Sequence, residues 1–327
     1  MGKLKIPEPV SGGLIISYQC NSSCLHCLYS CGPYWKEWID IETAEKYIKL
    51  LSQKERFRSL HITGGEPFLK FDLLVKIVEI CKKYEIPNFV ETNCFWAVED
   101  KITEEKLEIL KNSGMDAILI STSPFYLEKI PFENVERCLN IAEKIFGREN
   151  VMVYSNQGYQ IIKEMGVKGK MSWESFLRKV SSFKLLKFLE NYIVPKGKSL
   201  YTLSSFFQKI DVERILNQNC IADFLNPYHI HIDLYGNYIT SFCAGITLGK
   251  AEEVLNEGVD IQNRTILKLL SKNIGEFLKF AESYGYKRKE KYINKCHLCL
   301  DIRKFLVNKG YLFPSLSPLQ FYHYLEE

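Results

Sequence analysis

The sequence has no long hydrophobic run and little excess charge. No stretch of its 327 residues approaches the ~18–20 consecutive apolar residues that cross a bilayer, so we expect no membrane span. The formal net charge of +4 is too small for the basic surface of a nucleic-acid-binding domain. The first residues, Met1 to Pro7, contain no apolar signal core. These absences favour a cytoplasmic protein that has neither a membrane nor a nucleic acid as partner.

What is present is a globular composition with many cysteines. Hydrophobic residues make up 46% of the chain and charged residues 25%, which suits a sizeable core in one large or two ordinary domains. The 11 cysteines are odd in number, and a long chain without a signal peptide is a poor candidate for a disulfide framework. We therefore expect free thiols that bind metal or take part in catalysis.

Three of these cysteines lie close together after a β-prone apolar run at residues 14–18. Cys20, Cys24 and Cys27 have the spacing C-x3-C-x2-C. Soft thiolates suit iron–sulfur clusters or zinc. Three thiolates around one cluster leave one iron without a protein ligand, and an open position is typical of a catalytic metal. Half of a zinc site, completed by a fourth ligand elsewhere, is the alternative.

Strand and helix patterns alternate through the first half of the chain. The expected strands are 14–18, 59–63, 88–92, 117–121 and 151–155, and the expected helices are 41–52, 73–84, 103–111 and 133–146. This alternation predicts a parallel sheet with right-handed crossovers. Parallel α/β barrels carry their functional groups at the carboxyl ends of the strands. The candidate functional residues lie at the carboxyl ends of all five expected strands: Cys20, Gly64, Asn93, Ser121 and Ser155.

One strand–helix unit after the cysteines stands Gly64-Gly65-Glu66-Pro67, which alone would read as a turn. The two motifs together resemble the radical S-adenosylmethionine (radical SAM) superfamily. There, three cysteines hold a [4Fe-4S] cluster whose free iron binds SAM, and reductive cleavage of SAM gives a 5′-deoxyadenosyl radical. The resemblance implies an α/β fold, a partial (β/α)6 TIM-like barrel over residues 10–200. It also implies an electron donor such as flavodoxin or ferredoxin.

Further residues follow from the same resemblance. Gly64, Gly65, Glu66 and Pro67 would contact SAM, with Glu66 orienting its ammonium group. Thr92-Asn93-Cys94 is similar to the family's Thr-Asn-Gly, and residues 120–123 are similar to its Ser-x-Asp-Gly, which implies that Asn93 and Ser121 also contact SAM. The Asp-Gly pair is missing here, which puts the substrate role of this segment in doubt. The backbone at His26 would approach adenine.

The β-α pattern fades between residues 158 and 219, where we expect one helix over 171–189. A β-hairpin is expected over 229–242, with its turn at 235–237, followed by a helix over 265–284. Four cysteines accompany these elements: Cys220, Cys243, Cys296 and Cys299. Such a set can close around structural zinc or around a cluster.

The order of cysteine, hairpin, cysteine, helix and C-x2-C resembles the twitch domain, the short form of the SPASM domain. The resemblance implies a C-terminal β-hairpin-plus-helices domain over 206–327 that holds an auxiliary [4Fe-4S] cluster and relays electrons. The interval from Gly236 to Cys243 is longer than is usual in that family. The neighbouring histidines His229, His231 and His297 are interpreted as surface residues or supports of the cluster rather than as metal ligands.

The sequence thus predicts a radical SAM enzyme that acts on a peptide or protein by oxidation, cross-linking or epimerisation. A small-molecule dehydrogenase is the alternative, and a zinc-binding regulatory or scaffold protein is the alternative of another class. Epimerisation requires a hydrogen donor, for which Cys31 and Cys94 are candidates. Cys81 and Cys138 lie in expected helices and are interpreted as buried apolar residues.

Overall fold

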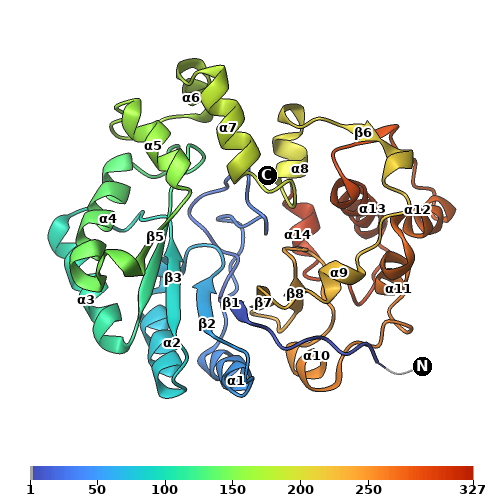
Figure 1. Ribbon diagram of the computed structural model, residues 1–327, viewed down its shortest axis with the longest axis horizontal. Helices are drawn as coiled ribbons and strands as arrows, with labels where there is room; N and C mark the ends of the chain where they lie inside the picture. Colours follow the sequence, from blue (N-terminus) through green and yellow to red (C-terminus); the bar gives the residue numbers. More distant parts are fainter. Residues whose placement is uncertain (1–2, 327) are drawn as a thin grey trace.

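The computed structural model describes residues 3–326 and is organised around one seven-stranded sheet (Figure 1). The strand order is β5-β4-β3-β2-β1-β7-β8. The strands are β1 Ser11–Ile15, β2 Ser59–Thr63, β3 Asn88–Thr92, β4 Ala117–Ser121, β5 Val151–Tyr154, β7 Ile230–Asp233 and β8 Tyr238–Thr240. All pairs are parallel except β7–β8, which is antiparallel. The predicted parallel α/β sheet is therefore confirmed.

Four long helices connect the first five strands and lie along the outside of the sheet (Figure 1). They are α1 Ile41–Ser52, α2 Phe71–Lys83, α3 Asp100–Ser113 and α4 Phe132–Phe146. Their ends follow local chemistry: Asp40 caps α1 by accepting a hydrogen bond from the Thr43 amide, and Gly114 ends α3 with a φ of 112°. Each of these helices was expected to within three residues.

The remaining elements are shorter. The helices are α5 Asn156–Glu164, α6 Trp173–Lys179, α7 Ser182–Tyr192, α8 Ser199–Thr202, α9 Ile221–Phe224, α10 Ala251–Glu257, α11 Thr265–Lys272, α12 Ile274–Ser283, α13 Lys295–Asn308 and α14 Gln320–His323. Strands β6 Ile210–Asp211 and β9 Lys291–Tyr292 form a separate antiparallel pair. Across residues 3–326, no helix combines the length and the apolar character that crossing a bilayer requires.

Two of the expected helices are wrong in extent, because each is two helices. The segment 171–189 breaks between α6 and α7, where Ser181 accepts a hydrogen bond from the Lys184 amide. The segment 265–284 breaks at Asn273, which is extended and accepts from the Glu276 amide. Side chains of this kind compete with the helical backbone and start a new helix. The apolar spacing continues across both breaks, so periodicity alone does not reveal them.

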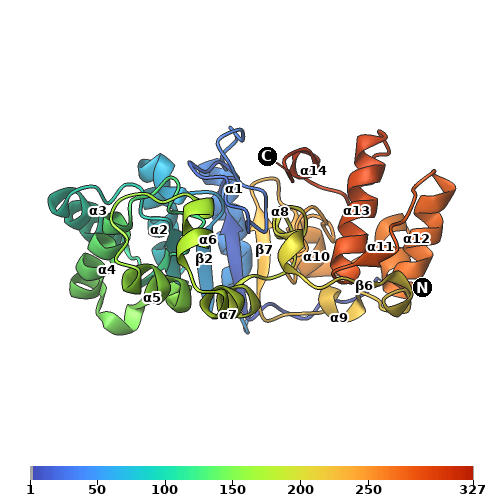
Figure 2. The same cartoon turned by 90° about the horizontal axis from the view of Figure 1, so that it is seen from above.

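The C-terminal half of the chain adds to the same sheet. Strand β7 pairs in parallel with β1, so that Gly12 lies opposite Ile230 and Gly13 opposite His231. The sheet thus continues across the expected domain boundary near residues 200–206, and the predicted hairpin forms its far edge. Seen from above, α3 and α4 lie at one end of an elongated molecule and α11 to α13 at the other (Figure 2).

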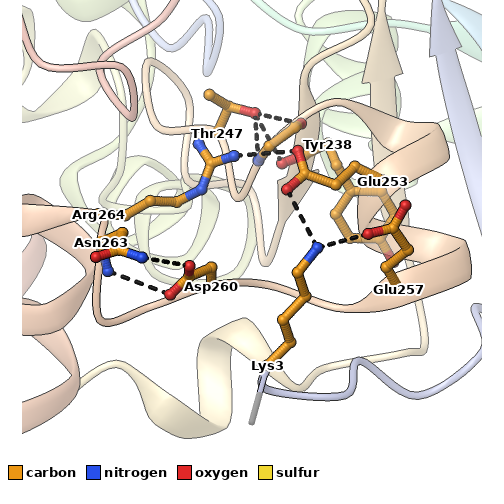
Figure 3. Close-up of polar contacts among 9 residues, drawn as sticks. Lys3, Tyr238, Thr247, Glu253, Glu257, Asp260, Asn263 and Arg264 are labelled. Atoms are coloured by element: carbon orange, nitrogen blue, oxygen red, sulfur yellow. Dashed lines mark hydrogen bonds and ion pairs between the residues drawn. The ribbon is translucent and has the colours of Figure 1, made fainter. Parts of the chain in front are cut away.

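The N-terminal segment lies against α10 in the C-terminal half (Figure 3). The Lys3 ammonium is 2.6 Å from Glu257 and 3.9 Å from Glu253, both on α10. Exposed ion pairs of this kind add little to stability. The backbone contact is the firmer one, since the Leu4 and Val259 amides each donate to the other's carbonyl at 2.8 Å. The segment before β1 is therefore held to the segment after α10 by two backbone hydrogen bonds.

Candidate active site

The first cysteine set lies in a closed loop directly after β1. The base of the loop is held by the Cys20 amide, which donates to Gly32 O at 3.1 Å, and by the Gly32 amide, which donates to Tyr18 O at 3.2 Å. Cys20 and Cys24 are buried and Cys27 is partly buried. All three line one cavity of about 360 Å³ at the carboxyl ends of the strands. The three predicted thiols are therefore brought to one place.

Most of the other predicted site residues line the same cavity. They are Cys31, Gly64, Gly65, Glu66, Asn93 and Ser121. Two predicted residues, Pro67 and Cys94, are not among the described residues that line it. Pro67 begins the short 3-10 helix η1 (Pro67–Lys70), whereas Cys94 is fully buried beside Cys138.

The glycines of the Gly-Gly-Glu-Pro turn are required by close backbone packing against the cysteine loop. The Gly65 amide donates to Ser17 O at 2.8 Å, and the Glu66 amide donates to Gln19 O at 2.9 Å. A Cβ atom on Gly64 would lie 2.1 Å from Ser17 O, and one on Gly65 would lie 1.8 Å from Gln19 O. Gly64 also has a φ of 138°, which side chains disfavour. The two sequence motifs are thus physically one unit.

Gly65→Ala is expected to disorganise the cysteine loop, because its Cβ would overlap the backbone at Gln19. Overpacking in a well-packed site costs typically about 1–3 kcal/mol. We expect a lower iron content after anaerobic reconstitution and a lower melting temperature. Gly166→Ala is the control for the iron content: its φ of 62° strains the backbone, but a Cβ there has no atom within 4 Å. Equal iron contents in the two variants would contradict the packing argument.

Glu66 connects this turn to the end of β3. Its carboxylate accepts hydrogen bonds from the Asn93 amide at 2.7 Å, from Thr92 Oγ1 at 2.9 Å and from the Phe68 amide at 3.2 Å. Burial raises the pKa of Glu66 to about 7. Asn93 in turn donates from its side chain to Asn21 in the cysteine loop at 2.9 Å. The predicted residues Glu66 and Asn93 are therefore parts of one hydrogen-bonded network.

A second acidic residue, Glu91, was not predicted. It projects from β3 and lines the cavity, where it accepts from Ser121 Oγ at 2.5 Å and Thr63 Oγ1 at 3.1 Å. Its carboxylate is also 3.3 Å from His61 Nε2. Burial alone would raise the pKa of Glu91, but its contacts with His61, Ser121 and Thr63 lower it to about 2. The sequence signal was a lone charge within the apolar strand 88–92.

Three histidines line the cavity on the β7 side. His229 and His231 come from the hairpin and His61 comes from β2. One possible ligand atom of each ring lies within 4.8 Å of those of the other two. Burial lowers the pKa of His229 to about 4 and holds the pKa of His231 well below its usual value, which favours neutral rings. Of the three histidines first considered with the second cysteine set, only His297 stays apart from this cavity, buried on α13.

His26 also lines the cavity, within the cysteine loop. Its ring stacks on Phe125 at 4.7 Å and lies 3.1 Å from the Tyr192 hydroxyl. Burial lowers the pKa of His26 to about 4. Tyr126, Tyr154 and Met152 add further apolar surface to the same wall. Tyr126 lies between β4 and α4, and Met152 and Tyr154 belong to β5. These three were not predicted, because no local pattern marks them as cavity residues.

The second cysteine set lines its own small cavity, of about 30 Å³. Cys220, Cys243, Cys296 and Cys299 all belong to its wall. Three cationic side chains, Lys196, Lys295 and Arg303, join them and, among the described residues, outnumber the one carboxylate in the wall, Asp223, which pairs with Lys295 at 2.7 Å. Buried thiolates require nearby positive charge to offset their desolvation. The site therefore suits a negatively charged group held by four thiolates.

The turn before Cys243 explains the long interval after Gly236. Ser241 and Phe242 have φ values of 47° and 57°, so the chain curls back on itself after β8. The Cys243 amide then donates to Thr240 O at 2.8 Å. Phe242 lines both cavities, which makes it the side chain between the two thiol sets.

Comparison with known proteins identifies the domain that carries the first site. Residues 14–154 match the model of the radical SAM superfamily. This part of the chain, which holds the Cys20–Cys27 loop and the Gly64–Pro67 turn, is therefore a radical SAM domain, as the sequence predicted.

Curated relatives are more distant. YydG of Bacillus subtilis (strain 168), named as a peptide biosynthesis protein, is 25% identical over 126 residues, which are 38% of this chain and 40% of YydG. MJ0907 of Methanocaldococcus jannaschii, an uncharacterized protein, is 24% identical over 67% of this chain and 72% of its own length. The chain thus spans well under two thirds of YydG.

Two solved structures with bound AdoMet are similar to this chain at low identity. A structure of BtrN in complex with AdoMet and 2-DOIA has 15% identity and a TM-score of 0.43, over 84% of this chain and 89% of that one. A structure of anSMEcpe with bound AdoMet and the Cp18Cys peptide has 15% identity and a TM-score of 0.46, over 91% and 97%.

Proposed function

We propose that this radical SAM enzyme carries two [4Fe-4S] clusters and modifies a peptide or protein substrate. One observation carries the proposal: the three cysteines of the Cys20–Cys27 motif line one cavity, together with Cys31, and four cysteines from between residues 220 and 299 line a second one. The set of three lies in the radical SAM domain. In the set of four, Cys220 precedes the hairpin, Cys243 follows it, and Cys296 and Cys299 lie on α13. Phe242 lies in the wall of both cavities.

The residues of the larger cavity fit a cluster with SAM. The Cys20–Cys27 motif offers three thiols for the cluster, which leave one position for another ligand. When bound, the cluster and SAM supply a 5′-deoxyadenosyl radical that removes a hydrogen atom from the substrate. Glu66 offers a carboxylate for the ammonium group of SAM, and Asn93 and Ser121 offer polar side chains at the neighbouring strand ends. The buried Lys198 donates to Ser23 Oγ at 2.7 Å and adds positive charge behind the loop.

The set of four fits an auxiliary cluster better than a single zinc ion. In a tetrahedral zinc site, with Zn–S bonds of about 2.3 Å, the sulfur atoms lie about 3.8 Å apart. Among residues 3–326, the ligands drawn together closely enough for a single ion are the three histidines, and neither cysteine set is among such groups. Lys196, Lys295 and Arg303 supply compensating charge. Four thiolates leave no open iron, which favours a role in electron transfer.

The choice of a peptide substrate rests on YydG, which is named for peptide biosynthesis and matches 126 residues of this chain. The electron donor would be a flavodoxin or a ferredoxin.

Anaerobic reconstitution tests this proposal. We expect a brown protein with about eight irons per chain, which forms 5′-deoxyadenosine from SAM when dithionite is added. A colourless protein that holds stoichiometric zinc in its cysteine sites and does not cleave SAM would overturn it.

Cys31 is better placed than Cys94 as a hydrogen donor. Cys31 lines the large cavity, and its thiol is 3.4 Å from Gly64 O. Cys94 is turned away into the core, where burial and a hydrogen bond with the Cys138 thiol raise its pKa. If the enzyme epimerises its peptide, Cys31→Ala should still form 5′-deoxyadenosine but incorporate no solvent deuterium into the product. Cys94→Ala should do both, and deuterium incorporation by Cys31→Ala at wild-type iron content would exclude Cys31.

A further inference from the structure

Three neighbouring strands place His61, Gly13 and His231 in one row across the sheet. Gly13 on β1 pairs with His61 on β2 and with His231 on β7. Side chains of paired residues in a sheet point to the same face. His229 precedes His231 by two residues and lines the same cavity. The three imidazoles therefore converge on one wall of the catalytic cavity from β2 and β7.

Gly13 provides the space in which these rings meet. A Cβ atom at this position would lie 2.4 Å from Cδ2 and 2.7 Å from Nε2 of His231. Gly13 is an ordinary residue of a parallel strand and does not have a positive φ. The backbone conformation at residue 13 therefore does not require glycine. The His231 ring does, because it occupies the space that a Cβ atom would need.

The polar atoms of the three rings are only partly satisfied by the protein. His231 Nδ1 is buried without a hydrogen-bond partner. His229 Nδ1 lies 2.8 Å from Ser11 Oγ, which leaves its other nitrogen for a different partner. A buried polar atom without a partner costs about 1–3 kcal/mol. If these histidines served only as packing, no interaction would offset this cost.

The surroundings are those of a metal site. The Glu91 carboxylate lies 3.3 Å from His61 Nε2, and a carboxylate beside a histidine commonly fixes the orientation of a ligating ring. One possible ligand atom from each of the three rings lies within 4.8 Å of the others. Neutral imidazoles are ligands for zinc and other divalent transition metals, and three protein ligands are typical of sites that keep one position open.

We propose that His61, His229 and His231 bind one divalent transition-metal ion in the wall of the catalytic cavity. This site is separate from both cysteine sets. Its open position faces the cavity and would take an oxygen ligand, such as a carbonyl or carboxylate group of the substrate. The ion would thereby hold the substrate near the radical SAM site, and no redox step is assigned to it. The binding of the ion does not depend on which substrate the enzyme modifies.

Zinc binding by the cluster-loaded protein tests the proposal. Protein with both cysteine sets filled is incubated anaerobically with Zn²⁺ and freed of excess metal, and zinc and iron are measured by mass spectrometry. We expect one zinc per chain. Its X-ray absorption spectrum should show only nitrogen or oxygen ligands, at about 2.0–2.1 Å, and no sulfur at about 2.3 Å. Less than stoichiometric zinc, or sulfur ligation, would overturn the proposal.

Variants assign the zinc to these residues. His229→Gln removes one ligand at a partly exposed position, and Gly13→Ala leaves all ligands but crowds the His231 ring. Both should lose at least nine tenths of the zinc at unchanged iron content. His323→Gln is the control, because His323 is exposed on α14. Zinc retained by both site variants would overturn the proposal, and the unchanged iron content shows that each variant is folded.

Discussion

Cys24→Ala is expected to abolish formation of 5′-deoxyadenosine. Cys24 is buried in the wall of the large cavity, within the Cys20–Cys27 loop, and two thiols cannot hold a cluster in the manner of three. Iron should fall from about eight to about four per chain, because the set of four around the other cavity is untouched. Chromatography of the reaction with SAM and dithionite should show a loss of at least a hundredfold.

Cys81→Ala is the matched control for this result. Cys81 is as deeply buried but lies on α2, outside both cavities. Its replacement removes a small apolar contact and should leave iron content and SAM cleavage unchanged. If Cys24→Ala retained both its iron and its cleavage of SAM, the Cys20–Cys27 loop would not be the site of the chemistry.

Cys243→Ala should separate SAM cleavage from product formation. Cys243 belongs to the set of four, so its loss should again remove about four irons per chain. The first site is lined by other cysteines, so 5′-deoxyadenosine should still form with dithionite at a rate within about threefold of wild type. Formation of the modified peptide should fall by at least a hundredfold, because the second redox partner is gone.

The same variant can contradict the proposed role of the second site. Product formation near the wild-type rate by Cys243→Ala, at half the iron content, would show that the auxiliary site only supports the fold. A loss of SAM cleavage together with iron from both sites would instead show that the two sites fold as one unit across Phe242.

Most of the first half of the fold was predictable from local sequence, although the first strand, expected over residues 14–18, is Ser11–Ile15. The strands 59–63, 88–92 and 117–121 match the observed bounds because each is a short apolar run between turn residues or helix ends. The breaks at Ser181 and Asn273 were missed, since apolar periodicity runs through them. The parallel contact between β1 and β7 was also not predictable, because it joins segments more than two hundred residues apart.

The candidate site was predictable where a motif is contiguous. Two motifs were recognisable from the sequence alone: the spacing of Cys20, Cys24 and Cys27, and the turn at Gly64–Pro67. Backbone packing between them explains why they occur together. The environment of Glu91 depends on strand register, which brings His61 and Ser121 to it from the adjacent strands. A sequence pattern can indicate that a charged side chain is buried. It does not show which side chains form hydrogen bonds or ion pairs with it.

The histidine set illustrates the same limit. His229 and His231 are visible as a pair on one face of a strand, but their third member and the glycine between them come from β2 and β1. Because His229 and His231 lie close to Cys220 and Cys243 in the sequence, they were interpreted as surface residues or as supports of the auxiliary site. The structure places it on the large cavity instead.

Electron paramagnetic resonance of the reduced protein tests the central claim most directly. The account predicts signals from two [4Fe-4S] clusters, of which SAM changes only one. The SAM-sensitive signal should be absent from Cys24→Ala and present in Cys243→Ala, and the other signal should show the reverse. A single cluster signal in the wild type, or a SAM-sensitive signal that survives in Cys24→Ala, would contradict the assignment of the two cysteine sets.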